Sequence, residues 1–317
     1  MNTQYLQLLG LVAPVYLIIV TGFAVRRLGW LNAAADASLL RLVVNLLIPC
    51  LILDSILGNP SLARVENLIL PPVIGFASII IGFAVARLVS PWLGHDLRMR
   101  RTFAFTTGIY NYSYLALPLV VSLFNRATLG VLFTFNLGVE IAFWTVGLIV
   151  LTGSENKAGP GWRRVVNPPI LSIVFAVILN AIVRPEWLPH FLTSGIHTVG
   201  GIAIPLALLL TGATMADWIP SLKTGFRTPL VALAIGLRLG VLPVLFLLAA
   251  RWLPMSLELQ RIIVIQAAMP AGMLPVVIAK HYDGDPGAAL QVVIGTSVIG
   301  LLTIPFWIRV GLPLVGL

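Results

Sequence analysis

The stretch Gln266-Ala-Ala-Met-Pro-Ala-Gly-Met-Leu-Pro275 interrupts a long hydrophobic segment with two prolines and a glycine. A similar interruption, Asn111-Tyr-Ser-Tyr-Leu-Ala-Leu-Pro118, lies in the first half, and Pro275 follows Pro118 by 157 residues, about half of the chain. Proline removes a backbone donor and clashes with the preceding turn. In lipid, freed backbone groups are tolerated only inside protein or beside a water-filled cavity. Paired interruptions in two halves of a membrane protein indicate a transporter's binding site.

The composition identifies the broad class of protein. The 317 residues are 59% hydrophobic and only 10% charged, whereas soluble domains carry about 25% charged residues. The net charge of +9 is spread over short turns, so we expect no nucleic-acid partner. The single cysteine, Cys50, excludes a disulfide within the chain. The N-terminus has no basic region, so we expect the first span to be retained. These features predict an integral protein of the lipid bilayer.

Apolar segments of near-bilayer length recur along the whole sequence. We predict an all-α membrane protein with ten spans, at 5–25, 38–57, 68–90, 101–124, 127–151, 166–183, 197–216, 228–252, 259–280 and 287–310. A polar, Gly-rich segment at 152–165 lies at the midpoint and is expected to be a cytoplasmic linker. It separates 1–151 from 166–317, each with five spans.

The two halves resemble each other weakly and should enter the membrane in opposite directions, because five is an odd number. Ile48-Pro49 in span 2 matches Ile204-Pro205 in span 7, and spans 4 and 9 carry the paired interruptions. This pattern predicts two inverted repeats with broken, crossing helices 4 and 9. Proline is also common in membrane helices, so each proline taken alone could be a simple kink.

The basic residues favour one orientation. With the N-terminus outside, 13 Lys and Arg residues lie at the cytoplasmic side and six at the outer side. Cytoplasmic turns carry the excess of basic residues in membrane proteins. We therefore expect both termini outside.

The interruptions suggest the chemistry of the ligand. A half-helix that begins inside the membrane presents free N–H groups and a positive dipole end, which suit a carboxylate. Asn111 adds a side-chain amide, either as a ligand contact or as a cap for freed backbone groups. Gly272 leaves room for close backbone approach, and Gln266 could line the cavity.

Two charged residues lie deep in spans, and such residues are functional candidates. Glu140 could take up a proton during transport, or it could be a structural partner of Arg238. Arg238 could bind the carboxylate of a substrate through its guanidinium, or it could tie down backbone carbonyls near the interruption. Both remain candidates for coupling or charge pairing.

Other kinds of site are not expected. The four histidines fall in turns or at span ends, with no spacing that suggests a metal site. No nucleophile with a nearby base is recognisable, so we predict no enzyme and no cofactor.

At the interruptions the chain resembles the auxin efflux carrier family, which includes plant auxin exporters and bacterial permeases for malonate and malate. Gln266 to Tyr282 is similar to the family's second crossover, with its Pro-x-Gly-x-x-Pro core and a following Ala-Lys-x-Tyr. The stretch from Asn111 to Pro118 is similar to the first crossover. Ala13-Pro14-Val-Tyr16 and Leu47-Ile-Pro49 resemble the first two spans.

The resemblance implies a mechanism and an assembly. Spans 1, 2, 6 and 7 would form a scaffold domain that joins two copies as a homodimer, and spans 3–5 and 8–10 a transport domain that moves like an elevator. A small organic anion would bind beside the crossover and span 5, where Trp144 and Thr145 fall at positions of a glutamine and a tyrosine in the plant carriers. A bacterial inner membrane is the expected location. The expected substrate-binding residues are Asn111, Tyr112, Pro118, Glu140, Thr145, Gln266, Met269, Pro270, Gly272 and Pro275.

The chain also departs from the family, since Ser113 and Ala116 replace glycines of the first crossover and the plant carriers' long cytoplasmic loop is missing. A small organic acid is therefore a better expectation than an aromatic auxin. Two alternatives stay open. One is a sodium-coupled symporter of the bile-acid type, although Ala267, Ala268 and Ala271 offer few side-chain oxygens. The other is a membrane sensor, although the loops leave no room for an output domain.

Overall fold

The computed structural model describes residues 3–94, 96–153, 166–183, 187–218 and 228–316. These residues are helical with short connections, and they form no strand; one isolated antiparallel bridge joins Tyr110 and Ala271. Part of the expected linker, 154–165, lies outside the described residues, as do His95, Arg184 and the basic residues of 219–227.

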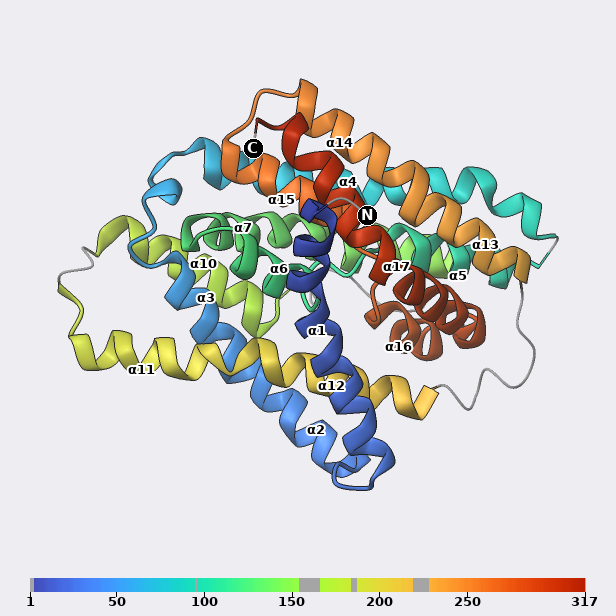
Figure 1. Cartoon of the computed structure of the whole chain (residues 1–317), viewed down its shortest axis with the longest axis horizontal. Helices are drawn as coiled ribbons and strands as arrows, with labels where there is room; N and C mark the ends of the chain where they lie inside the picture. The colour runs from blue at the N-terminus through green and yellow to red at the C-terminus, as the bar shows by residue number, and fades with distance from the viewer. Residues whose placement is uncertain (1–2, 95, 154–165, 184–186, 219–227, 317) are drawn as a thin grey trace.

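Seven helical segments in the described residues are long and apolar enough to cross a membrane. They are formed by α1 (Thr3–Arg27), α2 to α3 (Ala33–Leu42 and Ile48–Ile56), α4 (Glu66–Val89), α7 to α8 (Arg126–Ala142 and Leu148–Thr152), α11 to α12 (His190–Gly201 and Ala203–Trp218), α13 to α14 (Thr228–Gly236 and Leu242–Trp252) and α17 (Pro286–Leu314). The sixth expected span is the shorter apolar helix α10 (Pro168–Ile182). The chain is thus an all-α protein with the hydrophobic helices of a membrane protein (Figure 1).

The fourth and ninth expected spans are each a pair of short helices. The first pair is α5 (Leu97–Gly108) and α6 (Ala116–Leu123), and the second is α15 (Leu257–Ala268) and α16 (Leu274–His281). Residues 109–115 and 269–273 between them are not helical. We call these two segments the first break and the second break.

The expected limits agree with the helices to within a few residues, except at the seventh span. The prediction began at residue 197, whereas α11 begins at His190. The polar residues there fit a helix because their hydroxyls donate to carbonyls within the same helix, as Thr193 does to His190 and Thr198 to Ser194. Such internal bonds let polar residues extend an apolar helix.

Among the described residues, three spans contain a π-helical turn that the sequence did not reveal. These turns are η1 (Val43–Leu47), η4 (Phe143–Gly147) and η7 (Leu237–Val241). A π turn inserts an extra residue into the helix and is frequent at functional sites. Two of the turns involve candidate residues, since η4 contains Thr145 and η7 contains Arg238.

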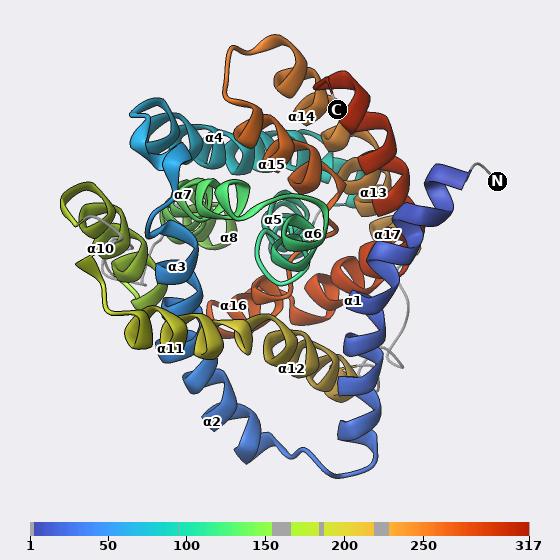
Figure 2. The same ribbon diagram turned by 60° about the vertical axis from the view of Figure 1, so that its left-hand side comes forward.

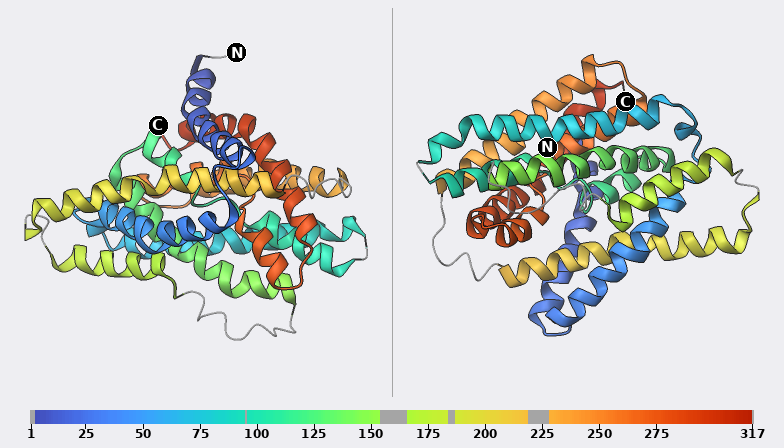
Figure 3. Two further views of the ribbon diagram at one scale, coloured as in Figure 1. Left: turned by 90° about the horizontal axis from the view of Figure 1, so that it is seen from below. Right: turned by 180° about the vertical axis from the view of Figure 1, so that it is seen from behind.

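Glycines bring two pairs of helices into close contact. Helix α1 packs along α12 (Figure 2). A Cβ on Gly212 would overlap the carbonyl oxygen of Ile19. Helix α4 packs along α7 (Figure 3). A Cβ on Gly138 would overlap the carbonyl oxygen of Pro72. Small residues at such interfaces let backbones approach closely, as is typical of helix packing in membranes.

The helices pack in two groups. In the first group, α1 packs against α12, and α3 packs against α10 and α11. In the second, α4 packs against α5 and α7, and α17 packs against α13 and α15. The groups touch where α1 meets α17 and where α3 meets α7. Arg26 joins three elements of the first group, since it pairs with Asp36 of α2 and with Asp217 of α12, the latter at 3.2 Å.

Candidate functional site

The two breaks meet inside the protein. The backbone N–H of Asn111 donates to the carbonyl oxygen of Pro270 at 2.8 Å, and the N–H of Gly272 donates to Ile109 at 2.9 Å. A Cβ on Gly272 would lie 3.1 Å from the carbonyl oxygen of Tyr110, so glycine permits this approach. Backbone groups freed by one break are therefore satisfied by the other, as the interior of a membrane protein requires.

Asn111 caps the helix that follows the first break. Its Oδ1 accepts from the backbone N–H of Leu115 at 3.2 Å, and only 5% of the residue is exposed. This is the capping role that the sequence left open beside ligand contact. Among the described residues, no acceptor pairs with Nδ2 of Asn111, which leaves this donor available to a ligand.

Tyr112 connects the first break to two neighbouring helices. Its carbonyl oxygen accepts from Nε2 of Gln266 at 3.1 Å and from Nδ2 of Asn136 at 3.4 Å. Its hydroxyl donates to Oε1 of Glu140 at 2.6 Å, and Nε1 of Trp144 donates to the other carboxylate oxygen at 2.8 Å. Each oxygen of this intramembrane carboxylate therefore has one donor, and Glu140 is held directly beside the break.

Arg238 also lies beside the first break, but it does not contact Glu140 in the described structure. Its side chain is fully buried, with the guanidinium carbon 4.9 Å from the ring centre of Tyr110 and 5.4 Å from that of Phe246. Its Nη2 lies 3.4 Å from the carbonyl oxygens of Gln266 and Ala267, at the end of α15. No ion pair joins Arg238 to Glu140 in the described structure, so the suggested charge pair is absent. The contacts match the other reading, in which Arg238 holds carbonyls near the break.

The remaining predicted residues occupy different places. Pro270 and Met269 belong to the second break and are buried, and Pro275 is in the first turn of α16, where the missing N–H of proline costs nothing. Pro118 is inside α6, after the first break has ended. Thr145 donates to the carbonyl oxygen of Ile141 within its own helix, and no hydrogen bond of its side chain reaches either break.

Three further side chains, which the sequence did not indicate, form hydrogen bonds to the breaks. Thr296 accepts from the backbone N–H of Ala271 at 3.2 Å, and the hydroxyls of Ser78 and Tyr110 are 2.6 Å apart. Asn136 bonds to the first break, as described above. The only sequence signal was a single polar residue on an apolar helix, which usually serves helix contacts.

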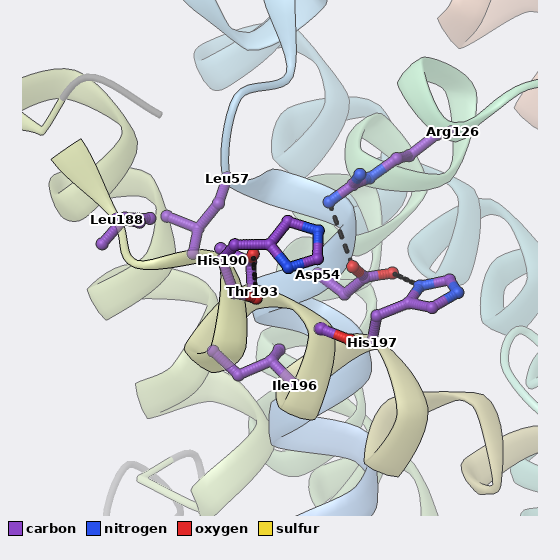
Figure 4. Close-up of a pocket in the computed structure, with 9 residues that line it drawn as sticks. Asp54, Leu57, Arg126, Leu188, His190, Thr193, Ile196 and His197 are labelled. Carbon is purple, nitrogen blue, oxygen red and sulfur yellow. Dashed lines mark hydrogen bonds and ion pairs between the residues drawn. The ribbon is translucent and has the colours of Figure 1, made fainter. Parts of the chain in front are cut away.

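A separate open pocket of about 430 Å³ lies between α3, α11 and the start of α7, and it contains none of the predicted site residues (Figure 4). The carboxylate of Asp54 contacts two other residues that line the pocket, Arg126 and His197. One carboxylate oxygen lies 3.1 Å from Nη2 of Arg126 and the other 3.1 Å from Nδ1 of His197. These contacts link α3 and α11 of the first helix group to α7 of the second. In the part of the chain that is described, no group of three or more His, Cys, Asp or Glu could hold a metal ion.

Comparisons with known proteins identify relatives of the chain. The profile of a family described as Membrane transport protein matches residues 8–161 and 160–308. An uncharacterized transporter of Methanothermobacter thermautotrophicus is 26% identical over 305 residues, which cover 93% of this chain and 96% of that protein. Auxin efflux carrier component 7 of Arabidopsis thaliana is 28% identical over 155 residues, covering 48% of this chain and 25% of the plant protein. Component 8 of the same plant is 26% identical over 145 residues, covering 45% and 39%.

Proposed function

This chain belongs to the membrane transport protein family, of the auxin efflux carrier type, and on that premise we propose that it is a secondary transporter of a small organic anion. It acts by transport and not by catalysis. The observation that carries the proposal is the meeting of the two breaks, where Asn111 N–H bonds to Pro270 and Nδ2 of Asn111 has no acceptor among the described residues. A carboxylate is the natural acceptor for such a donor beside the starts of two half-helices.

The proposed architecture has ten membrane crossings in two inverted repeats, 1–151 and 166–317. Seven long helical segments, α10 and the two broken pairs supply the ten crossings. The two breaks occupy equivalent places in the two halves, and their mutual hydrogen bonds support a crossing of helices 4 and 9. Transporters of this type place the substrate near the middle of the bilayer, at the interface of the repeats.

The proposed movement is an elevator. The first helix group, with α1–α3 and α10–α12, would be the scaffold domain, and the second group, with α4–α8 and α13–α17, would be the transport domain. The packing of helices within each group supports this division. Both breaks belong to the second group, so a bound anion would travel with it. This is a rigid-body form of alternating access.

The proposed assembly is a homodimer through the scaffold helices, in the inner membrane of a bacterium, with both termini outside. The exposed apolar side chains of α10 and α11, such as Phe175 and Phe191, suit either lipid or a second copy. Light scattering in detergent tests the dimer. Reporter fusions at each terminus test the orientation, which depends on the bias of basic residues.

The decisive test of the substrate site is a thermal-shift screen of purified protein with mono- and dicarboxylates and aromatic acids. A ligand that binds only the folded state raises the melting temperature. The shift should shrink in Asn111→Ala. It should persist in the control Asn45→Ala, because Asn45 is exposed and its one bond to a described residue is to Arg41, one turn away. Equal shifts in both variants would remove Asn111 from the site.

A specific observation favours sodium coupling as a second candidate. Oδ1 of Asn136 and Oε1 of Gln266 are buried and have no hydrogen-bond partner in the described part of the chain, although both amide nitrogens reach the carbonyl of Tyr112. Oxygen atoms without donors suit a cation such as Na⁺. Sodium chloride should then raise the melting temperature more than choline chloride does. Equal effects of the two salts would leave only the uncoupled or proton-coupled transporter.

A further inference from the structure

A groove between the end of α4 and the start of α5 is charged at one end and apolar at the other, as a phospholipid is. Its lining comes from one face of each helix: Ala84, Arg87 and Leu88 on α4, with Ser90 and Pro91 following, and Leu97, Arg100, Arg101 and Ala104 on α5. The spacings of three and four residues place each set on a single helix face. The groove has a volume of about 590 Å³, which is enough for a headgroup and the adjoining part of an acyl chain.

The charged end of the groove is strongly cationic. Arg87, Arg100 and Arg101 line it, and no acidic residue does. Arg101 donates to the carbonyl oxygen of Thr152 at 3.1 Å, and no acidic residue of the described ranges forms an ion pair with it. Nε of Arg100 is buried and has no hydrogen-bond partner within the described ranges. Three guanidinium groups in one groove repel one another, so a bound anion would stabilise the arrangement.

The other end of the groove is apolar and lies deeper along both helices. Ala84 precedes Arg87 by about 4.5 Å of helix, and Ala104 follows Arg101 by a similar rise. Small alanine side chains leave space there for a hydrocarbon chain. Leu88 is 78% exposed and Trp92 is 77% exposed beside the groove, and tryptophan is enriched where membrane meets water.

We propose that this groove binds an anionic phospholipid, with the phosphate on the three arginines and an acyl chain over Ala84 and Ala104. A free phosphate would use only the charged end and would leave the apolar end empty. If the three arginines served only as solvated surface residues, the apolar end of the groove between the two helices would have no explanation. Basic pockets between membrane helices are suited to anionic headgroups. The groove lies outside the candidate substrate site, so this proposal does not depend on the transported solute.

The test is a titration of detergent-purified protein with phosphatidylglycerol, phosphatidylcholine or soluble glycerol phosphate, read as the melting temperature. Phosphatidylglycerol should stabilise the protein at a lower concentration than phosphatidylcholine. Each arginine removed should raise the phosphatidylglycerol concentration at half-saturation about fivefold. The double variant Arg87→Gln/Arg100→Gln should therefore raise it about 25-fold. The single variant Arg87→Gln keeps the test valid if the double variant fails to fold, since Arg87 is exposed.

The matched control is Arg64→Gln, which removes one exposed arginine outside the groove and should leave the preference unchanged. Equal half-saturation by the two lipids in the wild type would overturn the proposal. So would a preference for phosphatidylglycerol that survives in Arg87→Gln/Arg100→Gln. A stabilisation by glycerol phosphate as large as that by phosphatidylglycerol would assign the groove to free phosphate and not to lipid.

Discussion

Glu140 accepts one hydrogen bond on each carboxylate oxygen, from Tyr112 and from Trp144. Tyr112 belongs to the first break, so the carboxylate is tied to the backbone segment that would move with a substrate. A charge in a membrane span needs such partners. The contact gives a physical route by which binding at the break and the state of Glu140 can affect each other.

We predict that Glu140→Gln removes the pH dependence of transport. Glutamine keeps the size and an acceptor oxygen for Tyr112, but it cannot take up a proton. The measurement is uptake into proteoliposomes of the ligand found in the binding screen, across a range of external pH. Trp144→Phe, which removes one donor and keeps the carboxylate, serves as the control and should retain a pH dependence. A Glu140→Gln profile that follows the wild type would exclude Glu140 as the proton carrier.

We also predict that Arg238→Lys lowers stability. The guanidinium lies over the rings of Tyr110 and Phe246, and lysine, a more strongly hydrated point charge, replaces such stacking poorly. A buried cation–π contact contributes about 2 kcal/mol, so the melting temperature should fall by several degrees. The control is Arg251→Lys, where the side chain is exposed and, of the described groups, bonds only to the carbonyl oxygen of Leu314. An unchanged melting temperature in Arg238→Lys would show that these contacts add no stability.

At the scale of elements, the breaks are held by neighbouring helices as well as by each other. Helix α17 supplies Thr296, which is fully buried and accepts from the backbone N–H of Ala271. Helix α4 supplies Ser78, whose hydroxyl pairs with that of Tyr110. A break without helical hydrogen bonds needs such partners, because an unsatisfied buried N–H is costly.

Helix α17 offers a matched pair of substitutions, Thr296→Val and Thr303→Val. Thr296→Val should leave the N–H of Ala271 without a partner and cost about 1–3 kcal/mol. Thr303→Val removes a hydroxyl that is buried with no hydrogen-bond partner, so it should be neutral or slightly stabilising. Melting temperatures of the two variants provide the comparison. Equal losses in both would mean that the Thr296 hydroxyl does not support the second break.

At the scale of the whole molecule, the contacts of Asp54 bridge the two helix groups. His197 belongs to α11 in the proposed scaffold, whereas Arg126 begins α7 in the proposed transport domain. An elevator movement must break the contact with Arg126 and preserve the one with His197. The open pocket around Asp54 lies at this boundary (Figure 4).

Cross-linking can therefore test the movement. In a Cys50→Ala background, linking Asp54→Cys to Arg126→Cys with a short bifunctional maleimide should stop uptake, because it joins the moving group to the static one. Linking Asp54→Cys to His197→Cys should leave uptake in place, because both positions lie in the scaffold. Uptake of the same ligand before and after linking is the measurement. Full uptake through a linked 54–126 pair would rule out the elevator.

Local sequence was enough to predict where the chain is hydrophobic and where a helix ends. The limits of the spans could be predicted from the sequence because the length of an apolar segment and the effect of proline are local properties. The breaks at 109–115 and 269–273 fall at the two interruptions read from the sequence, and close approach at Gly272 was expected. The family resemblance also came from these residues, and the profile match over both halves agrees with it.

Which side chains meet is evident only once the chain has folded. Glu140 pairs with Tyr112 and Trp144 and not with Arg238, and Asn136 and Thr296 hold the breaks although nothing local distinguished them. Partners far apart along the chain depend on how helices rotate and cross when they pack. The rotation and crossing of the helices depend on the shapes and small residues of many helices together, so they cannot be predicted from any single stretch of sequence.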